Sequence, residues 1–330
     1  MKTPIPKLTS IAKGLLIALL TCCINGVNAQ HVSFGNKMKV ELGLNFGPTF
    51  FLGDLGGNHG KGTKFIKDVN LELTKMMKGA FITVYPREWI GFRLAGQYTF
   101  VSGDDEVINT GGVHELWRKQ RNLDFKSDMW EVYSAVEIYP TLYLAGESDD
   151  KPVYQPYAFI GIGFFHFNPK GSLIDQYGRK SWYALHPLRT EGQGMAEYPE
   201  KKPYSLTQIN IPMGGGIRRV FNDRYTASIE LLYRKTFTDY IDDVSTTYID
   251  PVYFNHYLSS EQAVIARAIH DKTVGIVTPG VNRYEPGTQR GNSKNMDAYF
   301  SILLKFGIRL GDSNDYTRSA RMQTRCPHFF

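Results

Sequence analysis

The chain has few cysteines, little sustained helical periodicity and little net charge. Only 3 of its 330 residues are cysteines. Cys22 and Cys23 lie in an N-terminal segment that we expect to be removed, which leaves Cys326 alone and excludes an intramolecular disulfide framework. The chain has 38 Lys and Arg and 32 Asp and Glu. Removal of residues 1–29 takes away three lysines and no acids, so the remaining surplus is too small to indicate a nucleic-acid partner.

The first residues have the composition of a secretory signal peptide. Lysines precede an apolar run over residues 14–24, and short residues follow it, which predicts cleavage between Ala29 and Gln30. The run is too short to span a bilayer. A lipidated cysteine at one of the two adjacent N-terminal positions is the alternative, but the residues before these cysteines fit a lipobox poorly. We expect residues 1–29 to direct export and to be removed.

Aromatic residues and glycine are abundant where helical patterns are missing. The sequence contains 20 Tyr, 20 Phe and 32 Gly, and apolar residues alternate with polar ones or glycine in several segments. Over 39–47, Val40, Leu42, Leu44 and Phe46 share one face. Alternation with a period of two is typical of strands with two different surroundings. An exported chain of this composition is expected to be all-β.

Eight such segments follow one another, at 39–47, 77–85, 90–103, 128–140, 157–167, 205–221, 225–237 and 296–310. The connections alternate between short or moderate (86–89, 141–152, 222–224) and long (54–74, 104–123, 169–204, 238–295). Outer-membrane barrels have an even number of strands, short periplasmic turns and long extracellular loops. The sequence therefore predicts an eight-stranded antiparallel transmembrane β-barrel over residues 30–311, located in the cell outer membrane with both ends in the periplasm.

A soluble exported barrel or sandwich is the alternative, because it also alternates. The two differ in which face is outside: lipid requires the apolar face outward. Charged residues in the middle of strands, and aromatic residues near strand ends at Phe100, Trp130, Tyr139 and Phe165, favour the membrane barrel with aromatic girdles. The lipid bilayer is thus the first expected partner.

The segment 157–167 is apolar on both faces. It contains Gly161 and Gly163 and is too short for a membrane helix. As the fifth barrel strand it needs no water on either side. We expect its lumenal face to be apolar or small, with the charged lumenal residues supplied by neighbouring strands, and "NPKG" at 168–171 to mark where it leaves the membrane.

An acidic cluster follows the seventh segment. Asp239, Asp242 and Asp243 come shortly after Arg234 and Lys235, which we expect to be their counter-charges at the base of a loop. A calcium site is the alternative, but the spacing lacks the alternating ligands and turn glycine of an EF-hand. No metal site and no cofactor are expected.

The C-terminal segment 312–330 is basic and follows the last strand. Arg318, Arg321, Arg325, Cys326 and Pro327 are its candidate docking residues for a periplasmic protein, because a lone thiol in an oxidising compartment invites an intermolecular partner. A frayed terminus is the alternative.

Motifs for catalysis are missing from the sequence. There is no HExxH, no GxSxG and no paired-cysteine metal site. The glycine clusters at 161–163 and 214–216 lie within strands and do not open helices, so they do not indicate phosphate binding. For His166, a structural hydrogen bond is expected ahead of a catalytic role. We expect a non-enzymatic protein without a small-molecule substrate.

Several stretches resemble one known family. They are "YAFIGIGFFHFNPKG" (157–171), "LHPLRTEGQG" (185–194), "IPMGGGIRRVFNDRY" (211–225), "YRKTFTDYIDDVSTTY" (233–248), "LGLNFGPTFFLGDLGG" (42–57) and the terminal "RCPHFF". The chain resembles the PorG-like outer-membrane barrels associated with the type IX (Por) secretion system of Bacteroidetes. The inserts at 104–123 and 255–293 are less familiar.

The resemblance implies a non-enzymatic component of protein secretion. Such a protein is thought to tie the outer membrane to a periplasmic ring made of a lipoprotein and its partner. A surface adhesion or ligand-binding barrel of the OmpA/OmpX type, which uses its long loops, is the second hypothesis. A barrel enzyme acting on lipid or peptide is the third. Fold alone does not decide among them.

Overall fold

The computed structural model describes residues 38–55, 73–108, 113–146, 151–273 and 285–310. The expected signal peptide and C-terminal tail lie outside these ranges. Within them, no helix is both long and apolar enough to cross a membrane.

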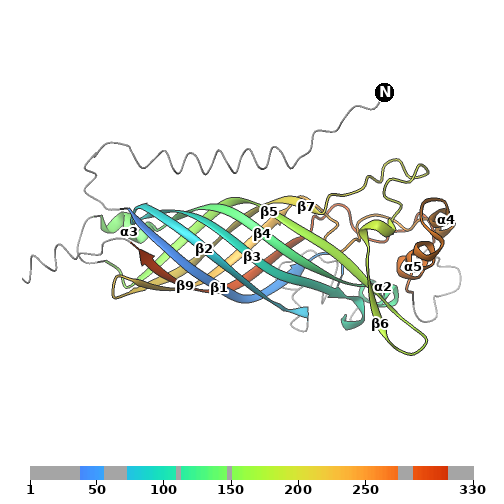
Figure 1. Ribbon diagram of the computed structural model, residues 1–330, viewed down its shortest axis with the longest axis horizontal. Coiled ribbons are helices and arrows are strands. Elements are labelled where there is room, and N and C mark those ends of the chain that lie inside the picture. Colours follow the sequence, from blue (N-terminus) through green and yellow to red (C-terminus); the bar gives the residue numbers. More distant parts are fainter. Residues whose placement is uncertain (1–37, 56–72, 109–112, 147–150, 274–284, 311–330) are drawn as a thin grey trace, which may run out of the picture. The chain divides into compact units, whose positions relative to one another are not determined.

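Nine strands make up the sheet (Figure 1). They are β1 (Lys39–Leu52), β2 (Lys75–Arg87), β3 (Ile90–Asp104), β4 (Asp124–Ile138), β5 (Tyr154–Ile174), β6 (Lys180–Ala184), β7 (Thr207–Phe221), β8 (Tyr225–Thr236) and β9 (Ala298–Leu310). All except β6 form a closed antiparallel barrel, which the pairing of β1 with β9 completes. Each of the eight segments expected from the sequence is one of these barrel strands, so the predicted fold class is confirmed.

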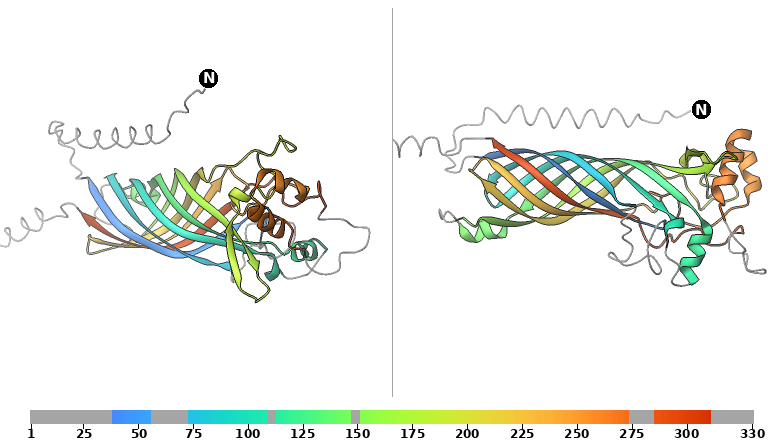
Figure 2. Two further views of the ribbon diagram at one scale, coloured as in Figure 1. Left: turned by 45° about the vertical axis from the view of Figure 1, so that its right-hand side comes forward. Right: turned by 90° about the horizontal axis from the view of Figure 1, so that it is seen from below.

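The two ends of the barrel differ. The short turns and the small helix α3 (Pro140–Ala145) lie at one end, where Val40 also pairs with Leu310. The described chain therefore enters and leaves the barrel at this end. The long connections and the helices α2 (Val113–Arg121), α4 (Phe254–Tyr257) and α5 (Ser260–His270) lie at the opposite end (Figures 1 and 2). In an outer-membrane barrel, the first end faces the periplasm and the second the cell exterior.

The outside of the barrel is apolar and its lumen is charged. Leu44 is 65% exposed and Ile160 59%, whereas Glu131 and Arg93 are 3% and 2% exposed. A soluble barrel would have the opposite arrangement, because water outside favours polar residues there. The chain is therefore a transmembrane barrel whose outer face contacts lipid.

An ion-pair network spans the middle of the lumen. Arg93 on β3 donates to both carboxylate oxygens of Glu230 on β8, at 2.9 and 2.6 Å, and also donates to Glu137. Lys305 Nζ donates to Glu230 Oε2 at 3.0 Å. Buried charges are costly unless each has partners of opposite charge and hydrogen bonds. Here every carboxylate of the network has a cation beside it.

The strand β5 supports the expectation made for its lumenal face. Tyr157, Phe159, Phe165 and Phe167 point inward and are buried. A Cβ on Gly163 would lie 2.5 Å from Asn210 Oδ1 and 2.8 Å from Tyr133 Cβ. The glycine thus makes room for larger side chains of the neighbouring strands, which also supply the charges.

Two expectations about strand ends are wrong. Phe100 and Trp130 are exposed on the outside, but Tyr139 and Phe165 are buried, so these two do not belong to an outer aromatic girdle. The expected end of the fifth segment at residue 167 is also wrong, because β5 continues as a strand through "NPKG". It runs on to Ile174 and pairs with β6 in a hairpin beyond the barrel.

The long extracellular connections fold together into a cap, which we define as residues 185–203 and 238–297 where described. It has an apolar core of its own, separate from the barrel interior, formed by Leu185, Leu188, Met195, Ile249, Phe254, Ala263, Ala266 and Ile269. The helix α5 begins with a capping box, in which Ser259 and Gln262 bond each other's backbone N–H groups. The cap is therefore a packed unit and not a set of independent loops.

Candidate functional site

The motif at 233–248 leaves the barrel and enters the base of the cap. Arg234 lies inside the barrel, where its Nε donates to Glu131 Oε2 at 3.2 Å and its Nη1 to Ser301 Oγ at 2.7 Å. Lys235 is exposed on the outside of β8. Neither residue pairs with the aspartates in the described structure. The expectation that they are the counter-charges of Asp239, Asp242 and Asp243 is therefore wrong, because the strand alternation turns Arg234 into the lumen.

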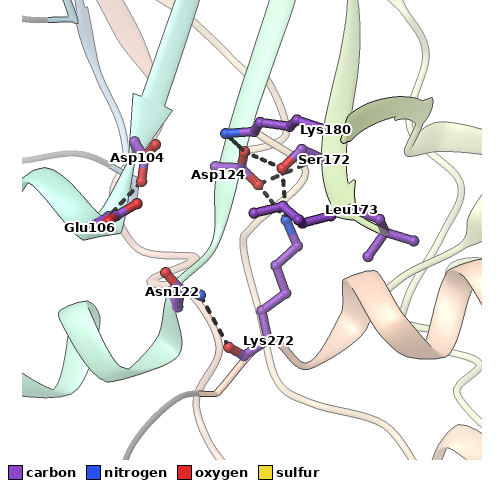
Figure 3. Close-up of a pocket in the computed structure, with 9 residues that line it drawn as sticks. Asp104, Glu106, Asn122, Asp124, Ser172, Leu173, Lys180 and Lys272 are labelled. Carbon is purple, nitrogen blue, oxygen red and sulfur yellow. Dashed lines mark hydrogen bonds and ion pairs between the residues drawn. The ribbon is translucent and has the colours of Figure 1, made fainter. Parts of the chain in front are cut away.

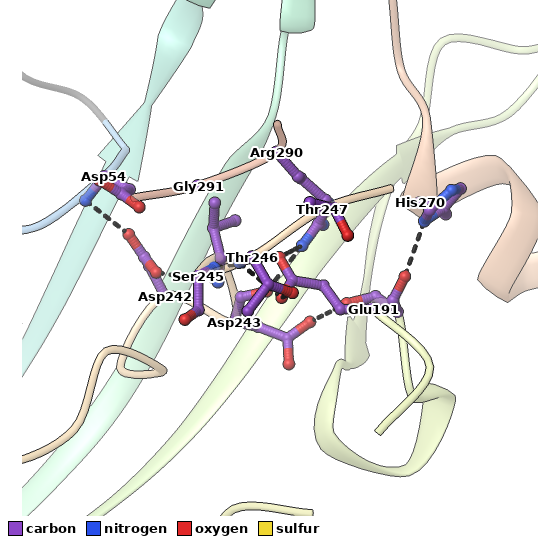
Figure 4. Close-up of polar contacts among 12 residues, drawn as sticks. Asp54, Glu191, Asp242, Asp243, Ser245, Thr246, Thr247, His270, Arg290 and Gly291 are labelled. Atoms are coloured by element: carbon purple, nitrogen blue, oxygen red, sulfur yellow. Dashed lines mark hydrogen bonds and ion pairs between the residues drawn. The ribbon is translucent and has the colours of Figure 1, made fainter. Parts of the chain in front are cut away.

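Asp242 fastens the end of β1 to the cap. Its Oδ2 accepts hydrogen bonds from the backbone N–H groups of Asp54 and Leu55 at 3.0 and 3.1 Å (Figure 4). Its Oδ1 accepts the N–H of Val244 at 3.0 Å. A buried carboxylate with three backbone donors holds two chain segments in one position. Its role is structural, and the contact closes the first connection over the barrel.

Glu191 and Arg290 form the centre of the cap base. Glu191 accepts from the N–H groups of Ser245 and Thr246 and from Arg290 Nη1, at 3.0, 2.9 and 3.0 Å. Arg290 also donates to the carbonyl of Asp243 at 2.7 Å (Figure 4). Both side chains are buried. The actual counter-charge of this acidic region is thus Arg290, which lies in the same long connection (238–295) as the aspartates but far from them in sequence.

Arg121, at the end of α2, supplies a second cation. It donates to both oxygens of Asp105, at 2.7 and 3.0 Å, and to the backbone carbonyls of Asp54 and Arg290 at 2.8 and 2.6 Å. A guanidinium can satisfy several acceptors at once because its five N–H groups point in fixed directions. Three connections are joined at this one side chain.

Asp243 is held by two hydroxyl donors. Thr190 and Tyr204 donate to its two oxygens at 2.5 and 2.6 Å. Its backbone has a φ of 62°, a left-handed conformation that aspartate tolerates better than most residues. Burial raises the pKa of Asp243 to about 6, against the opposing charge of Arg290 and these hydrogen bonds.

The remaining aspartates lie close together without a cation for each. Burial, with the nearby carboxylates of Asp54 and Asp242, raises the pKa of Asp239 to about 9. Burial and the carboxylates of Asp242 and Asp239 also raise the pKa of Asp297 well above its usual range. At neutral pH this group therefore retains protons. Among the described residues, no set of three or more Asp, Glu, His or Cys side chains is arranged to hold a metal ion.

His270 at the end of α5 is a neutral member of the cap. Its Nδ1 lies 2.7 Å from the carbonyl oxygen of Thr190, which can only accept (Figure 4). Burial and the charge of Arg290 lower the pKa of His270 to about 4. The imidazole therefore links α5 to the Glu191 segment as a hydrogen-bond donor.

A cavity of about 200 Å³ lies beside the β5–β6 hairpin (Figure 3). Asp124 is at its centre: it accepts from Ser172 Oγ at 2.5 Å and pairs with Lys180 at 2.9 Å and with Lys272. The amide of Asn122 donates to the Lys272 carbonyl at 3.4 Å. The polar groups here satisfy one another, so the cavity provides a polar surface and no catalytic arrangement.

The other candidate residues fall outside the described residues. These are the cleavage pair Ala29 and Gln30, and the tail residues Arg318, Arg321, Arg325, Cys326 and Pro327. His166 is described: its Nδ1 lies 3.0 Å from Thr207 Oγ1 on the neighbouring strand, which is the structural hydrogen bond expected for it.

Sequence reasoning missed the partners of the aspartates. Glu191 lies within the stretch 185–194 that carries part of the family resemblance, but its role was not identified. Arg121 and Arg290 lie in or beside the less familiar inserts. A search for arginines in the long connections, as counter-charges for the acidic cluster, would have found both.

Comparisons with known proteins give barrels of low similarity. No family model matches the chain, and no curated protein matches it. Among solved structures, Ail of Yersinia pestis overlaps 83% of this chain and 98% of its own, at 8% identity and a TM-score of 0.32. A major outer membrane protein from Thermus thermophilus covers 83% and 100%, at 10% identity and a TM-score of 0.37. OprG from Pseudomonas aeruginosa covers 83% and 96%, at 9% identity and a TM-score of 0.35. Scores this low assign neither a family nor an activity to the chain.

Proposed function

We propose that this protein is a non-enzymatic scaffold of the outer membrane that serves type IX protein secretion by docking a periplasmic ring complex. The observation that carries the proposal is the place of the motif 233–248 in the structure, at the base of the cap. Its residues Asp242 and Asp243 join the barrel to a packed cap, so one of the stretches that carry the family resemblance also builds the base of the cap. The partners follow from the resemblance: a ring lipoprotein and its partner.

The filled lumen supports a scaffold role and argues against a wide pore. Arg93, Glu230 and Arg234 cross the middle of the barrel and are buried. Eight-stranded barrels are narrow enough for side chains to fill them. Function is then expected at the two ends, and the periplasmic end and tail are the surfaces available to a periplasmic ring.

Deletion of the gene tests the secretion role. We expect loss of protein secretion and of secretion-dependent gliding. Pull-down from detergent-solubilised outer membranes, followed by mass spectrometry, should recover periplasmic ring proteins. If a chain without residues 314–330 co-purifies with the same partners, the tail is not the docking element. Normal secretion in the deletion strain would overturn the proposal.

A surface adhesion or ligand-binding role is the second candidate, favoured by the β5–β6 hairpin. This hairpin extends beyond the barrel and carries Tyr177, which is 74% exposed. Trp182 on β6 lies under Lys126 Nζ, 4.1 Å from its ring centroid. Normal secretion with altered binding of cells to surfaces would support this candidate.

A further inference from the structure

The periplasmic mouth of the barrel contains a cavity of about 340 Å³. Five basic and two acidic side chains line it. One of the acids, Glu88, is already paired: Lys39 Nζ and Lys151 Nζ lie 2.9 and 2.6 Å from its two oxygens. The basic excess of the cavity therefore lies on the arginines of β7 and β9.

The Arg218 side chain is held in place, but not all of its N–H groups have a hydrogen-bond partner among the described residues. Its Nε and Nη2 donate to Gln155 Oε1 at 3.1 and 2.8 Å, and its guanidinium carbon lies 3.8 Å from the centroid of the Tyr139 ring. Its Nη1 makes no hydrogen bond with any described residue. The nearest paired carboxylate oxygen, Glu41 Oε2, is 3.9 Å away.

Arg309 lies near the same carboxylate, that of Glu41. Its Nε lies 3.6 Å from Glu41 Oε2 and makes no hydrogen bond with the described residues. Glu41 also accepts from Tyr85 at 3.2 Å and from Thr226 at 2.7 Å. One carboxylate that is already bonded thus faces two guanidinium groups, and leaving such donors unmatched is costly.

The strand alternation determines what can reach these groups. Arg218 is buried toward the lumen, whereas its neighbour Arg219, which also lines the cavity, is exposed on the other face of β7. On β9, Lys305 and Gly307 are buried, and Arg309 falls on the same face two residues further on. A ligand must therefore enter along the barrel axis from the periplasm. A phospholipid, whose chains lie outside the barrel, cannot place its phosphate there as readily as a polypeptide can place a side chain.

We propose that the periplasmic mouth binds a carboxylate from an acidic segment of a periplasmic protein, with Arg309 and Arg218 as the receiving groups. Guanidinium groups form short, charge-assisted and often bidentate hydrogen bonds to carboxylates. This inference rests on the proposed docking function and names the chemistry of the docking group.

Binding of fluorescein-labelled hexaglutamate to the full mature chain in nanodiscs tests this site. We expect saturable binding that weakens as salt increases, and no binding of hexaglutamine. R309Q should weaken binding at least tenfold, and R309K should retain part of it. R179Q is the matched control, because it removes the same charge from an exposed arginine at the opposite end of the molecule. Arg309 is preferred to the more deeply held Arg218 because its replacement is less disruptive.

Several outcomes would overturn the site. Unchanged binding in R309Q, or equal loss in R179Q, removes Arg309 from it. Displacement of the peptide by added phosphatidylglycerol assigns the pocket to a lipid headgroup. Tighter peptide binding in D312N/D315N assigns it to the chain's own tail. If R309Q still pulls down the periplasmic ring proteins, the pocket is wrong while the docking function stands.

Discussion

Arg290 Nη1 donates to Glu191 Oε1 at 3.0 Å, and this buried pair joins two extracellular connections through residues that lie 99 positions apart in the sequence. Each partner also bonds the backbone of the motif at 243–246. This ion pair therefore lies at the centre of the contacts that hold the cap base, whereas the barrel beneath has its own network. A mutation in one part should therefore destabilise that part without destabilising the other.

Loss of Glu191 should loosen the cap and leave the barrel folded. Removing one partner of a buried ion pair costs about 3–5 kcal/mol, because the other charge remains buried without compensation. We expect E191A to expose residues 238–273 to proteolysis while the barrel keeps its folded mobility on gels. E200A, at an exposed position of the same connection, is the control and should change neither. Equal protease resistance in E191A and the parent would contradict this role.

The lumenal network should show strong coupling across the barrel. We expect R93M and E230L each to destabilise the barrel by about 3–5 kcal/mol, and the double variant to cost less than the sum of the two. Urea unfolding in lipid vesicles, followed by the gel mobility shift of folded barrels, measures these changes. Strictly additive effects would show that the two side chains do not interact in the membrane.

A charged residue on the outer face should destabilise the barrel. Ile160 lies on the outside of β5 opposite Val136 and Met213. An arginine on the lipid face near the bilayer centre costs about 2–4 kcal/mol, so I160R should unfold at correspondingly lower urea concentration. I160L is the control and should stay within about 1.5 kcal/mol of the parent. A neutral effect of I160R would mean that water, not lipid, surrounds this face.

The cap should become less stable as pH rises above 7. The pKa of Asp239 is about 9 in the folded chain, against an ordinary value of about 3.9, so its proton is bound more tightly in the folded state. This contribution to stability is complete below pH 4 and is lost as pH rises toward 9. The pKa of His270, lowered to about 4, acts in the opposite direction but only up to about pH 6.5.

Hydrogen exchange, corrected for the intrinsic rate at each pH, measures this effect. Between pH 7 and 9, we expect protection in residues 238–250 to fall in the parent chain and to fall less in D239N. D250N is the control, because Asp250 lies outside the aspartate group and caps a short 3-10 helix. An identical pH dependence in D239N and the parent would exclude Asp239 as its source.

The sequence was sufficient for the barrel because lipid outside and charge inside impose a period of two on every strand. Glu131 and Arg93 are charged residues in the middle of strands, and they lie on the buried face, as the membrane-barrel interpretation requires. It was not sufficient at Pro169, where a long connection was expected to begin but β5 continues as a strand. There β5 leaves β7 and begins to pair with β6, a place where the missing N–H of proline is tolerated.

The cap could not be predicted for a different reason. Its contacts join residues far apart in the chain, such as Asp242 with Asp54 and Leu55, and no local period encodes them. The acidic cluster was visible in the sequence, but its partners were assigned to the nearest cations, Arg234 and Lys235. Alternation within β8 points Arg234 into the lumen, and the nearest residues in sequence were therefore not the nearest in space.

The contact of Arg93 with Glu230 spans the barrel from β3 to β8. Strands that are neighbours can pair in a barrel of any size, but these two side chains meet only at one diameter. A sheet that closed with one hairpin fewer or more would bring each of them opposite a different residue. The pair therefore forms only when the barrel closes with the right number of strands, and it stabilises that barrel over one with a different strand number.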